Sequence, residues 1–248
     1  MLPFNSNFFT RAKELFLHIL FPNTCYACRR DLALGQKEPL CEGCLKQIKT
    51  VGSLYCQRCG KPLPDGGAHC YQCRGTKARQ FKCKIIRSAV VFSPQIRSLV
   101  HAFKYADQAY LSDFLSDMMY RHFYDYTDLS ESELIIPVPL HAKKAKTRGY
   151  NQAELLAESL AQKLCLPLAK QVLKRVRNTP SQTKLGREDR LKNMSDAFEC
   201  VIGEKIKGKV VLLIDDVATT GATLEGCAAA LKKAGAKKVM AYTLARET

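Results

Sequence analysis

The cysteine residues of this chain form pairs whose spacing suits a metal ion. Eight of the 12 cysteines occur as four CxxC pairs, and a CxxC turn can place two thiolates on one edge of a tetrahedral site. Two such turns supply four sulfur ligands and leave no coordination position for water, so the metal would be structural. We predict two zinc sites, with an iron–sulfur cluster as the weaker alternative, on Cys25, Cys28, Cys41, Cys44, Cys56, Cys59, Cys70 and Cys73.

The order of the pairs suggests how they combine. Cys25, Cys28, Cys41 and Cys44 form a first quartet, and the remaining four cysteines form a second one. The spacing also allows interleaved pairing, and we prefer sequential sites, which are typical of tandem zinc ribbons. Residues 2–22 show no secretory signal. In a reducing compartment, paired cysteines of this kind bind metal rather than form disulfides.

A second group of residues suited to chemistry is an acidic pair followed by a short polar turn. Two aspartates come directly after the apolar run 210–214, and a helical pattern begins at residue 223. Carboxylates at a strand end can accept hydrogen bonds from ribose hydroxyls, and backbone N–H groups at a helix N-terminus favour a phosphate. We therefore predict a ribose 5-phosphate site, rather than a mere helix cap or Mg²⁺ site, on Asp215, Asp216, Ala218, Thr219, Thr220, Gly221, Ala222 and Thr223.

Alternating strands and helices must position this turn. Ligands of open α/β sheets bind at the carboxyl ends of strands, where the two aspartates lie. The Lys of a Walker loop and the GxGxxG motif are both absent from the turn. The alternation predicts a mostly parallel sheet flanked by helices, with strands at residues 85–92, 134–140, 210–214 and 239–244 and helices at residues 96–103, 111–124, 153–164 and 223–233.

The charge of the chain is strongly positive. Lys and Arg number 39 against 23 Asp and Glu, which gives a net charge of +16. Such a balance predicts attraction to nucleic acid, phosphorylated ligands or acidic lipid surfaces, and it does not choose among them. No apolar run approaches the ~20 residues that a membrane-spanning helix requires.

Several motifs together resemble a known family. The string VVLLIDDVATTGATL, at residues 210–224, resembles the signature with which type I phosphoribosyltransferases bind phosphoribosyl diphosphate (PRPP). The strings PVPLH at residues 137–141 and RGYNQAE at residues 148–154 resemble a narrower group, the ComF/GntX family of competence-associated proteins. The string FKY at residues 103–105, the stretch 178–198 and the preceding cysteine module resemble the same family.

The resemblance implies a role for each motif. Asp215 and Asp216 would hold the ribose hydroxyls, residues 218–223 would cradle the 5-phosphate, and the turn after Pro139 would approach the pyrophosphate, which carries Mg²⁺. Residues 178–190 would be a mobile loop that closes over PRPP. Lys104 and Arg148 are the candidates for phosphate contact and catalysis, and the sequence does not rank them above Lys143, Lys144 or Arg187. Thr219 stands where purine-salvage members usually have Asp, which argues against 6-oxopurine salvage.

The family resemblance and the composition together give a domain plan and a function. We expect an amphipathic helix at residues 1–22, a double zinc ribbon at 23–78 and a type I phosphoribosyltransferase-like domain at 79–248. We expect a cytoplasmic protein of DNA uptake and natural transformation that binds PRPP, or a related phosphosugar, and single-stranded DNA. Peripheral association with the inner membrane stays open. So do two other functions: an active phosphoribosyltransferase with an unknown acceptor, and a PRPP-responsive adaptor for another DNA-uptake protein.

Overall fold

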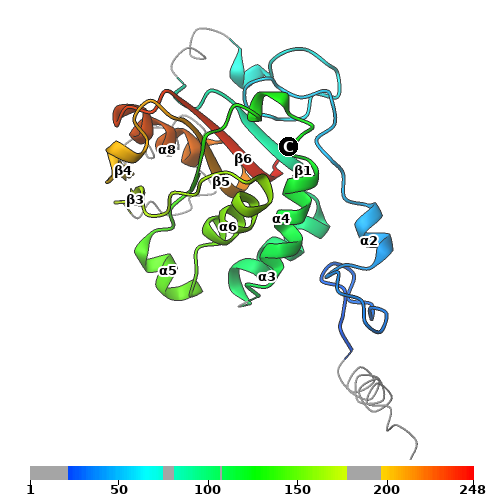
Figure 1. The fold of residues 1–248 in the computed structure, drawn as a ribbon. Coiled ribbons are helices and arrows are strands. Elements are labelled where there is room, and N and C mark those ends of the chain that lie inside the picture. Colours follow the sequence, from blue (N-terminus) through cyan, green and yellow to red (C-terminus); the bar gives the residue numbers. More distant parts are fainter. Residues whose placement is uncertain (1–21, 75–80, 107, 178–196) are drawn as a thin grey trace, which may run out of the picture.

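A parallel sheet forms the centre of the molecule in a computed structural model that describes residues 22–74, 81–106, 108–177 and 197–248 (Figure 1). Its four strands lie in the order β1-β6-β5-β2, and all three strand pairs are parallel. The strands are β1 (Ile86–Val91), β2 (Leu134–Pro137), β5 (Val210–Ala218) and β6 (Lys238–Arg246). The mostly parallel sheet predicted from the sequence is therefore confirmed.

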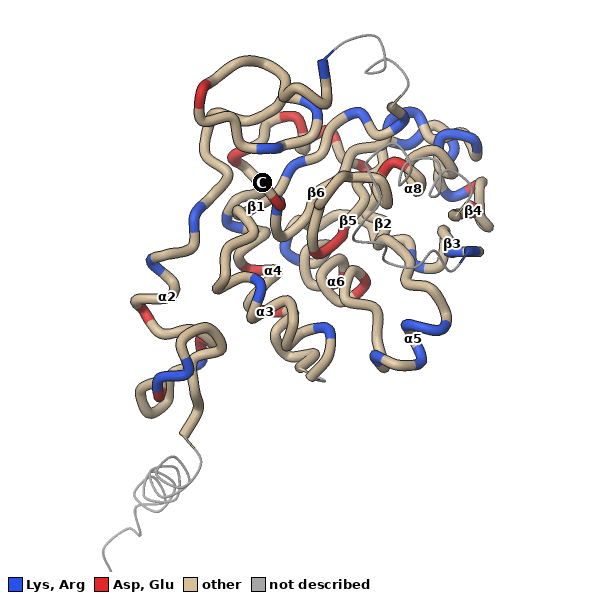
Figure 2. The backbone as a smooth tube through the Cα atoms, turned by 180° about the vertical axis from the view of Figure 1, so that it is seen from behind, with Lys and Arg blue, Asp and Glu red and all other residues tan. Residues whose placement is uncertain are grey.

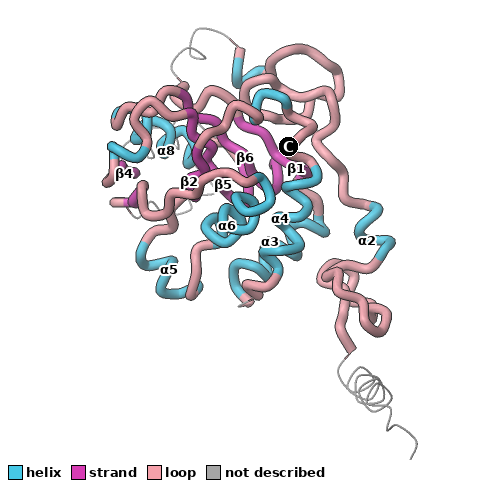
Figure 3. The backbone as a smooth tube through the Cα atoms, in the orientation of Figure 1, coloured by secondary structure: helices cyan, strands magenta, loops and turns pink. Residues whose placement is uncertain are grey.

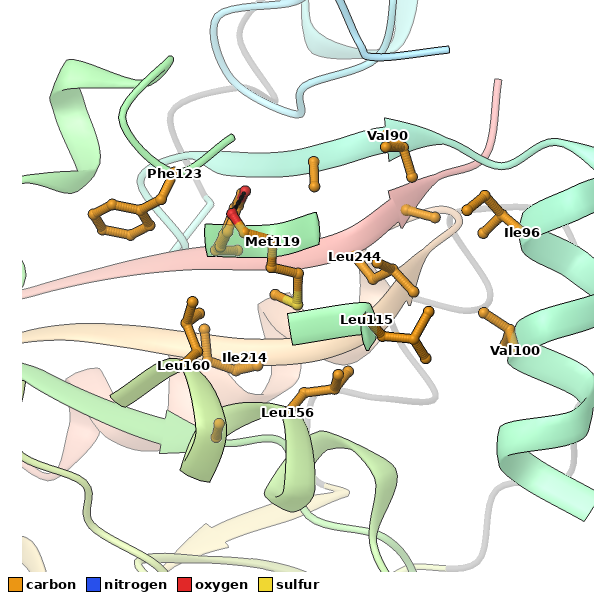
Figure 4. Packing of buried hydrophobic residues seen from close by; sticks show 14 of the residues in the cluster. Val90, Ile96, Val100, Leu115, Met119, Phe123, Leu156, Leu160, Ile214 and Leu244 are labelled. Carbon is orange, nitrogen blue, oxygen red and sulfur yellow. Dashed lines mark hydrogen bonds between the residues drawn. The ribbon is translucent and has the colours of Figure 1, made fainter. Parts of the chain in front are cut away.

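Helices cover both faces of this sheet (Figure 3). On one face lie α3 (Pro94–Tyr105), α4 (Leu111–Arg121) and α6 (Gln152–Leu164), and on the other lies α8 (Ala222–Lys233). The alternation of strand side chains separates two cores. Leu212 and Ile214 pack with α3, α4 and α6, whereas Val211 and Leu213 pack with α8. Figure 4 shows the first of these cores, in which side chains of the three helices meet those of the strands.

Local sequence signals explain where the helices begin. Ser93 accepts a hydrogen bond from the Ile96 N–H, and Pro94 occupies the first turn of α3, as expected of a helix N-terminus. Asn151 caps α6 in the same way and also donates to the Val138 carbonyl at 3.0 Å. That second bond fixes the start of α6 against the turn that follows β2.

Short elements connect the main ones. The helix α5 (Ala142–Arg148) follows β2, and β3 (Leu173–Arg175) pairs antiparallel with β4 (Phe198–Cys200). The helix α2 (Glu42–Lys46) belongs to the cysteine module, as do the single-turn helix η1 (Tyr71–Cys73) and the loops around them. Further single turns are η3 (Thr127–Leu129) and η4 (Gly203–Lys205). Most of residues 1–22 and all of the predicted mobile loop at 178–190 lie outside the described residues.

The cysteine module lies against the free edge of β1. The Val91 N–H donates to the Lys49 carbonyl at 2.8 Å, and the Ile86 N–H donates to the Arg58 carbonyl at 2.7 Å. These bonds satisfy backbone groups that an edge strand would otherwise leave open. The module is therefore joined to the sheet through backbone hydrogen bonds at both ends of β1.

Candidate functional site

A tight turn joins β5 to α8 at the carboxyl end of the sheet, and we call residues 218–223 the phosphate loop after the role that the sequence predicts for them. Gly221 has a φ of +78° and immediately precedes α8, a conformation that glycine adopts without strain. The Thr220 hydroxyl accepts from the Ala222 N–H at 3.3 Å. The buried side chains of α8 include Leu224, Cys227, Ala228 and Leu231, so packing against the sheet points the N-terminus of this helix at the turn.

The two aspartates lie near the carboxyl end of β5, just before this turn. Asp216 is buried, with 6% exposure, and its carboxylate forms an ion pair with the Lys104 ammonium group of α3. Asp215 accepts from the Asp216 N–H at 2.9 Å. Burial, and next the negative charge of Asp216, raise the pKa of Asp215 to about 7. The two aspartates thus offer several hydrogen-bond acceptors, and the negative charge of Asp216 is already balanced by Lys104.

The two candidate cations, Lys104 and Arg148, belong to motifs that the fold brings together. The Arg148 guanidinium donates to the Tyr105 hydroxyl at 2.9 Å and to the Gln152 side chain at 3.1 Å. The Tyr150 hydroxyl donates to the Phe103 carbonyl at 2.6 Å. The FKY segment at the end of α3 and the RGYNQ segment before α6 therefore form one hydrogen-bonded unit, which carries both cations.

Further basic residues lie in α5 and β3 (Figure 2). Burial, and then the positive charges of Arg175, Arg148 and Lys104, lower the pKa of Lys144. The negative charge of Asp215 acts in turn on Arg175, whose pKa is lowered mainly by burial. Cations this close repel one another, and an anion placed among them relieves that repulsion. The arrangement favours a multiply charged anion such as a phosphate or diphosphate.

Arg175, on whose pKa the charge of Asp215 acts, is a basic residue that the sequence did not single out. It stands in a polar, basic stretch with no periodic pattern, and it reaches the site because β3 pairs with β4, where its guanidinium lies 5.6 Å from the centre of the Phe198 ring. The two strands are separated in the sequence by residues 178–196, and no local sequence signal predicts that they pair. Lys143 and Lys146 of α5 are exposed, and Arg187 lies outside the described residues.

The eight predicted metal ligands form two groups. Cys25, Cys28, Cys41 and Cys44 gather in one place, and Cys56, Cys59, Cys70 and Cys73 in another, with the sulfur atoms of each group within 4.8 Å of one another. The Sγ–Sγ distance is 3.7 Å for Cys28–Cys41 and also for Cys59–Cys70. A tetrahedron with Zn–S bonds of about 2.3 Å has edges of about 3.8 Å, so both groups fit zinc. The preferred sequential pairing is confirmed.

None of the helices formed by the described residues is both long and apolar enough to cross a membrane.

Comparisons with known proteins agree with these two parts. Residues 16–74 match the model of the double zinc ribbon domain, and residues 151–248 match that of the phosphoribosyl transferase domain. The predicted fold class, a type I phosphoribosyltransferase-like α/β domain preceded by a zinc-ribbon module, is therefore confirmed.

Three relatives match nearly the whole chain. Competence protein F of Haemophilus influenzae is 34% identical over 90% of this chain and 96% of its own length. DNA utilization protein YhgH of Escherichia coli is 28% identical over 91% of this chain and 97% of its own. Competence protein ComFC of Bacillus subtilis is 30% identical, over 86% of each chain.

Proposed function

This chain belongs to the family of competence protein F and ComFC, and from that premise we propose that it acts in DNA uptake by binding PRPP together with Mg²⁺ and single-stranded DNA. The names of the relatives support a role in competence and the use of DNA. The site supports a ligand that carries both a sugar with free hydroxyls and several phosphates.

The observation that carries the proposal is the joint position of the acidic pair, the phosphate loop and the cations. Asp215 and Asp216 offer acceptors to vicinal hydroxyls, while the N-terminus of α8 offers backbone donors to a 5-phosphate. Lys144 and Arg148 supply positive charge for a diphosphate beside Lys104, whose charge Asp216 balances. A simple phosphate ester would use the loop alone and leave the acidic pair without a role.

Mg²⁺ would enter with the diphosphate, whose oxygen atoms are the ligands that this ion prefers. It would neutralise part of the diphosphate charge beside the cationic residues. The chain itself would hold the sugar and orient the diphosphate, which is the main work of a protein in phosphoribosyl transfer.

Single-stranded DNA binding is supported by charge and by exposed aromatic rings. The chain carries a net charge of +16, and α5 presents Lys143, Lys146 and Arg148 beside the site. Tyr105 is 63% exposed and stacks with the Arg148 guanidinium at 4.8 Å from its ring centre. Aromatic rings beside basic side chains are typical of surfaces on which single-stranded bases stack.

Isothermal titration of the zinc-loaded protein with PRPP and Mg²⁺ tests the proposal. We expect binding by the wild type and its loss in Asp215→Ala/Asp216→Ala. The control is Asp113→Ala/Asp117→Ala, which removes two carboxylates from α4 and so changes the net charge equally. It should bind like the wild type. Absence of binding by the folded wild type would contradict the proposal.

Two further measurements separate the other functions. Release of pyrophosphate only when one particular metabolite is added would make the protein an active phosphoribosyltransferase. PRPP binding without affinity for DNA, together with stable retention of another DNA-uptake protein, would make it an adaptor.

A further inference from the structure

A buried arginine joins the second zinc ribbon to the phosphate loop. Arg246, the last residue of β6, is only 3% exposed. Its Nε donates to the Cys59 carbonyl at 2.9 Å, and its Nη1 donates to the Ala218 carbonyl at 2.7 Å and to the Thr219 carbonyl. One guanidinium therefore holds the backbone of a zinc ligand and the backbone of the loop at the same time. Hydrogen bonds from a charged, buried donor are among the strong ones.

Ile86 makes a second connection between the same two parts. Its N–H donates to the Arg58 carbonyl, and its side chain lies under the loop, since a Cβ atom on Gly221 would stand 2.9 Å from the Ile86 Cδ1 atom. On the ribbon side, a Cβ atom on Gly60 would stand 2.6 Å from the Ile86 carbonyl oxygen. The ribbon and the loop thus both approach Ile86 of β1, each through a glycine with positive φ.

We infer that the second zinc ribbon positions the phosphate loop, with Arg246 as the positioning residue. The metal on Cys56, Cys59, Cys70 and Cys73 would fix the Cys59 carbonyl, and Arg246 would transmit that order to residues 218 and 219. Loss of this zinc would then weaken phosphosugar binding. The inference rests on the proposed function for its ligand, whereas the coupling of ribbon and loop stands on the contacts alone.

The first zinc ribbon provides a matched comparison. It meets the α/β domain at the start of α4, where the Tyr26 and Tyr110 hydroxyls lie 2.6 Å apart, and at α3, where the Gln95 side-chain amide donates to the Gln47 side chain at 2.5 Å. Its cysteine Cys25 belongs to the apolar cluster on the opposite face of the sheet from α8. Its zinc should therefore matter for the fold of the first ribbon and leave the loop unchanged.

Hydrogen exchange of the amides in residues 217–224 tests the coupling without any ligand. We expect Cys70→Ser/Cys73→Ser to speed exchange there at least tenfold and to weaken PRPP binding at least tenfold in titration. Cys41→Ser/Cys44→Ser should change neither. By linkage, PRPP should also raise the affinity of the second site for zinc in an equilibrium competition with a chelator and leave that of the first unchanged.

A second variant removes the connection and keeps both metals. Arg246→Met should retain two zinc ions per chain and still show fast amide exchange in the loop and weak PRPP binding. Arg246→Lys should restore part of the slow exchange and part of the PRPP affinity. Unchanged exchange in Arg246→Met, or equal effects of the two cysteine variants, would overturn the inference. If the wild type binds no PRPP, the proposed function fails, and the exchange measurements alone decide the coupling.

Discussion

Asp215 and Asp216 place two carboxyl groups side by side at the end of a buried strand. Lys104 balances Asp216, while burial and the charge of Asp216 raise the pKa of Asp215 to about 7. A carboxyl group whose pKa is raised in the folded state binds more protons there than in the unfolded chain. Its contribution to stability is therefore complete below about pH 4 and is lost as the pH rises through about 7.

The substitution Asp215→Asn should remove this pH dependence. Asn keeps the acceptor for the Asp216 N–H and carries no charge, so the variant should be more stable than the wild type wherever Asp215 is ionised in the unfolded chain. Its advantage should be larger near pH 8 than near pH 5.5 by about 2 kcal/mol, because the wild type must then hold a charge that is buried and lies beside Asp216. Thermal unfolding at both pH values measures this, with Asp113→Asn on the exposed side of α4 as control. An equal difference in stability between the variant and the wild type at both pH values would show that ionisation of Asp215 does not destabilise the folded state.

The residues of the site divide by how local their signal is. The cysteines lie within one short segment of the sequence, and the aspartates and loop threonines lie within another. Their types and spacing therefore predicted both sites. Arg246 and Arg175 act through partners far away in the chain, at Cys59 and beside Asp215. Strand register places Arg246 opposite Ala218, and a single sequence does not determine that register.

Helices and strands with a run or stripe of buried apolar residues were predicted from the sequence, whereas those without one were missed. The apolar runs at residues 210–214 and 239–244 predicted β5 and β6, and the helical patterns predicted α3, α4, α6 and α8. The helix α5 has no buried residue, so nothing in its pattern favoured a helix. The strand β5 continues to Ala218 because β6 pairs with it along its whole length, which places the aspartates within the strand.

The turn between β5 and α8 depends on the backbone of Gly221. An alanine there would carry a φ of +78°, which is costly for any residue with a Cβ, and would crowd Ile86. Gly221→Ala should therefore lower the free energy of unfolding by about 1–2 kcal/mol and weaken PRPP binding by shifting the loop donors. Urea unfolding and isothermal titration measure the two effects.

Gly208→Ala is the control for that substitution. Gly208 has a φ of +74°, and a Cβ atom added to it would meet no other atom within 4 Å. The residue lies before β5, at the opposite end of the sheet. The backbone cost should be similar to that at Gly221, whereas PRPP affinity should stay unchanged. Equal loss of affinity in both variants would mean that the loop is not the binding element.

At the scale of the whole molecule, composition predicted an affinity for polyanions and the family resemblance predicted two parts. Neither the composition nor the resemblance predicted how the two parts contact each other. The second ribbon contacts β1 and β6 through its backbone carbonyls, Arg246 of β6 links it to the carbonyls of the phosphate loop, and any sequence can present a backbone carbonyl. Such an interface leaves no pattern of residue types, and for that reason it is visible only in the structure.

The positive charge of the molecule should appear as a salt dependence of DNA binding. For single strands, log K falls with log[salt] with a slope of about −0.7 for each phosphate neutralised. A short single-stranded oligonucleotide, followed by fluorescence anisotropy at several salt concentrations, should give a slope between about −2 and −5, which corresponds to about three to seven phosphates.

The slope also locates the DNA-binding surface. Lys143 and Lys146 are exposed on α5, which follows β2 at the carboxyl edge of the sheet. Lys143→Gln/Lys146→Gln should therefore make the slope shallower by about 1. Lys205→Gln/Lys207→Gln removes the same charge from exposed positions before β5, at the opposite edge, and should leave the slope nearly unchanged. If the two variants behave alike, the attraction comes from net charge and not from the face that carries the phosphate loop. Binding that does not respond to salt would contradict an electrostatic DNA site altogether.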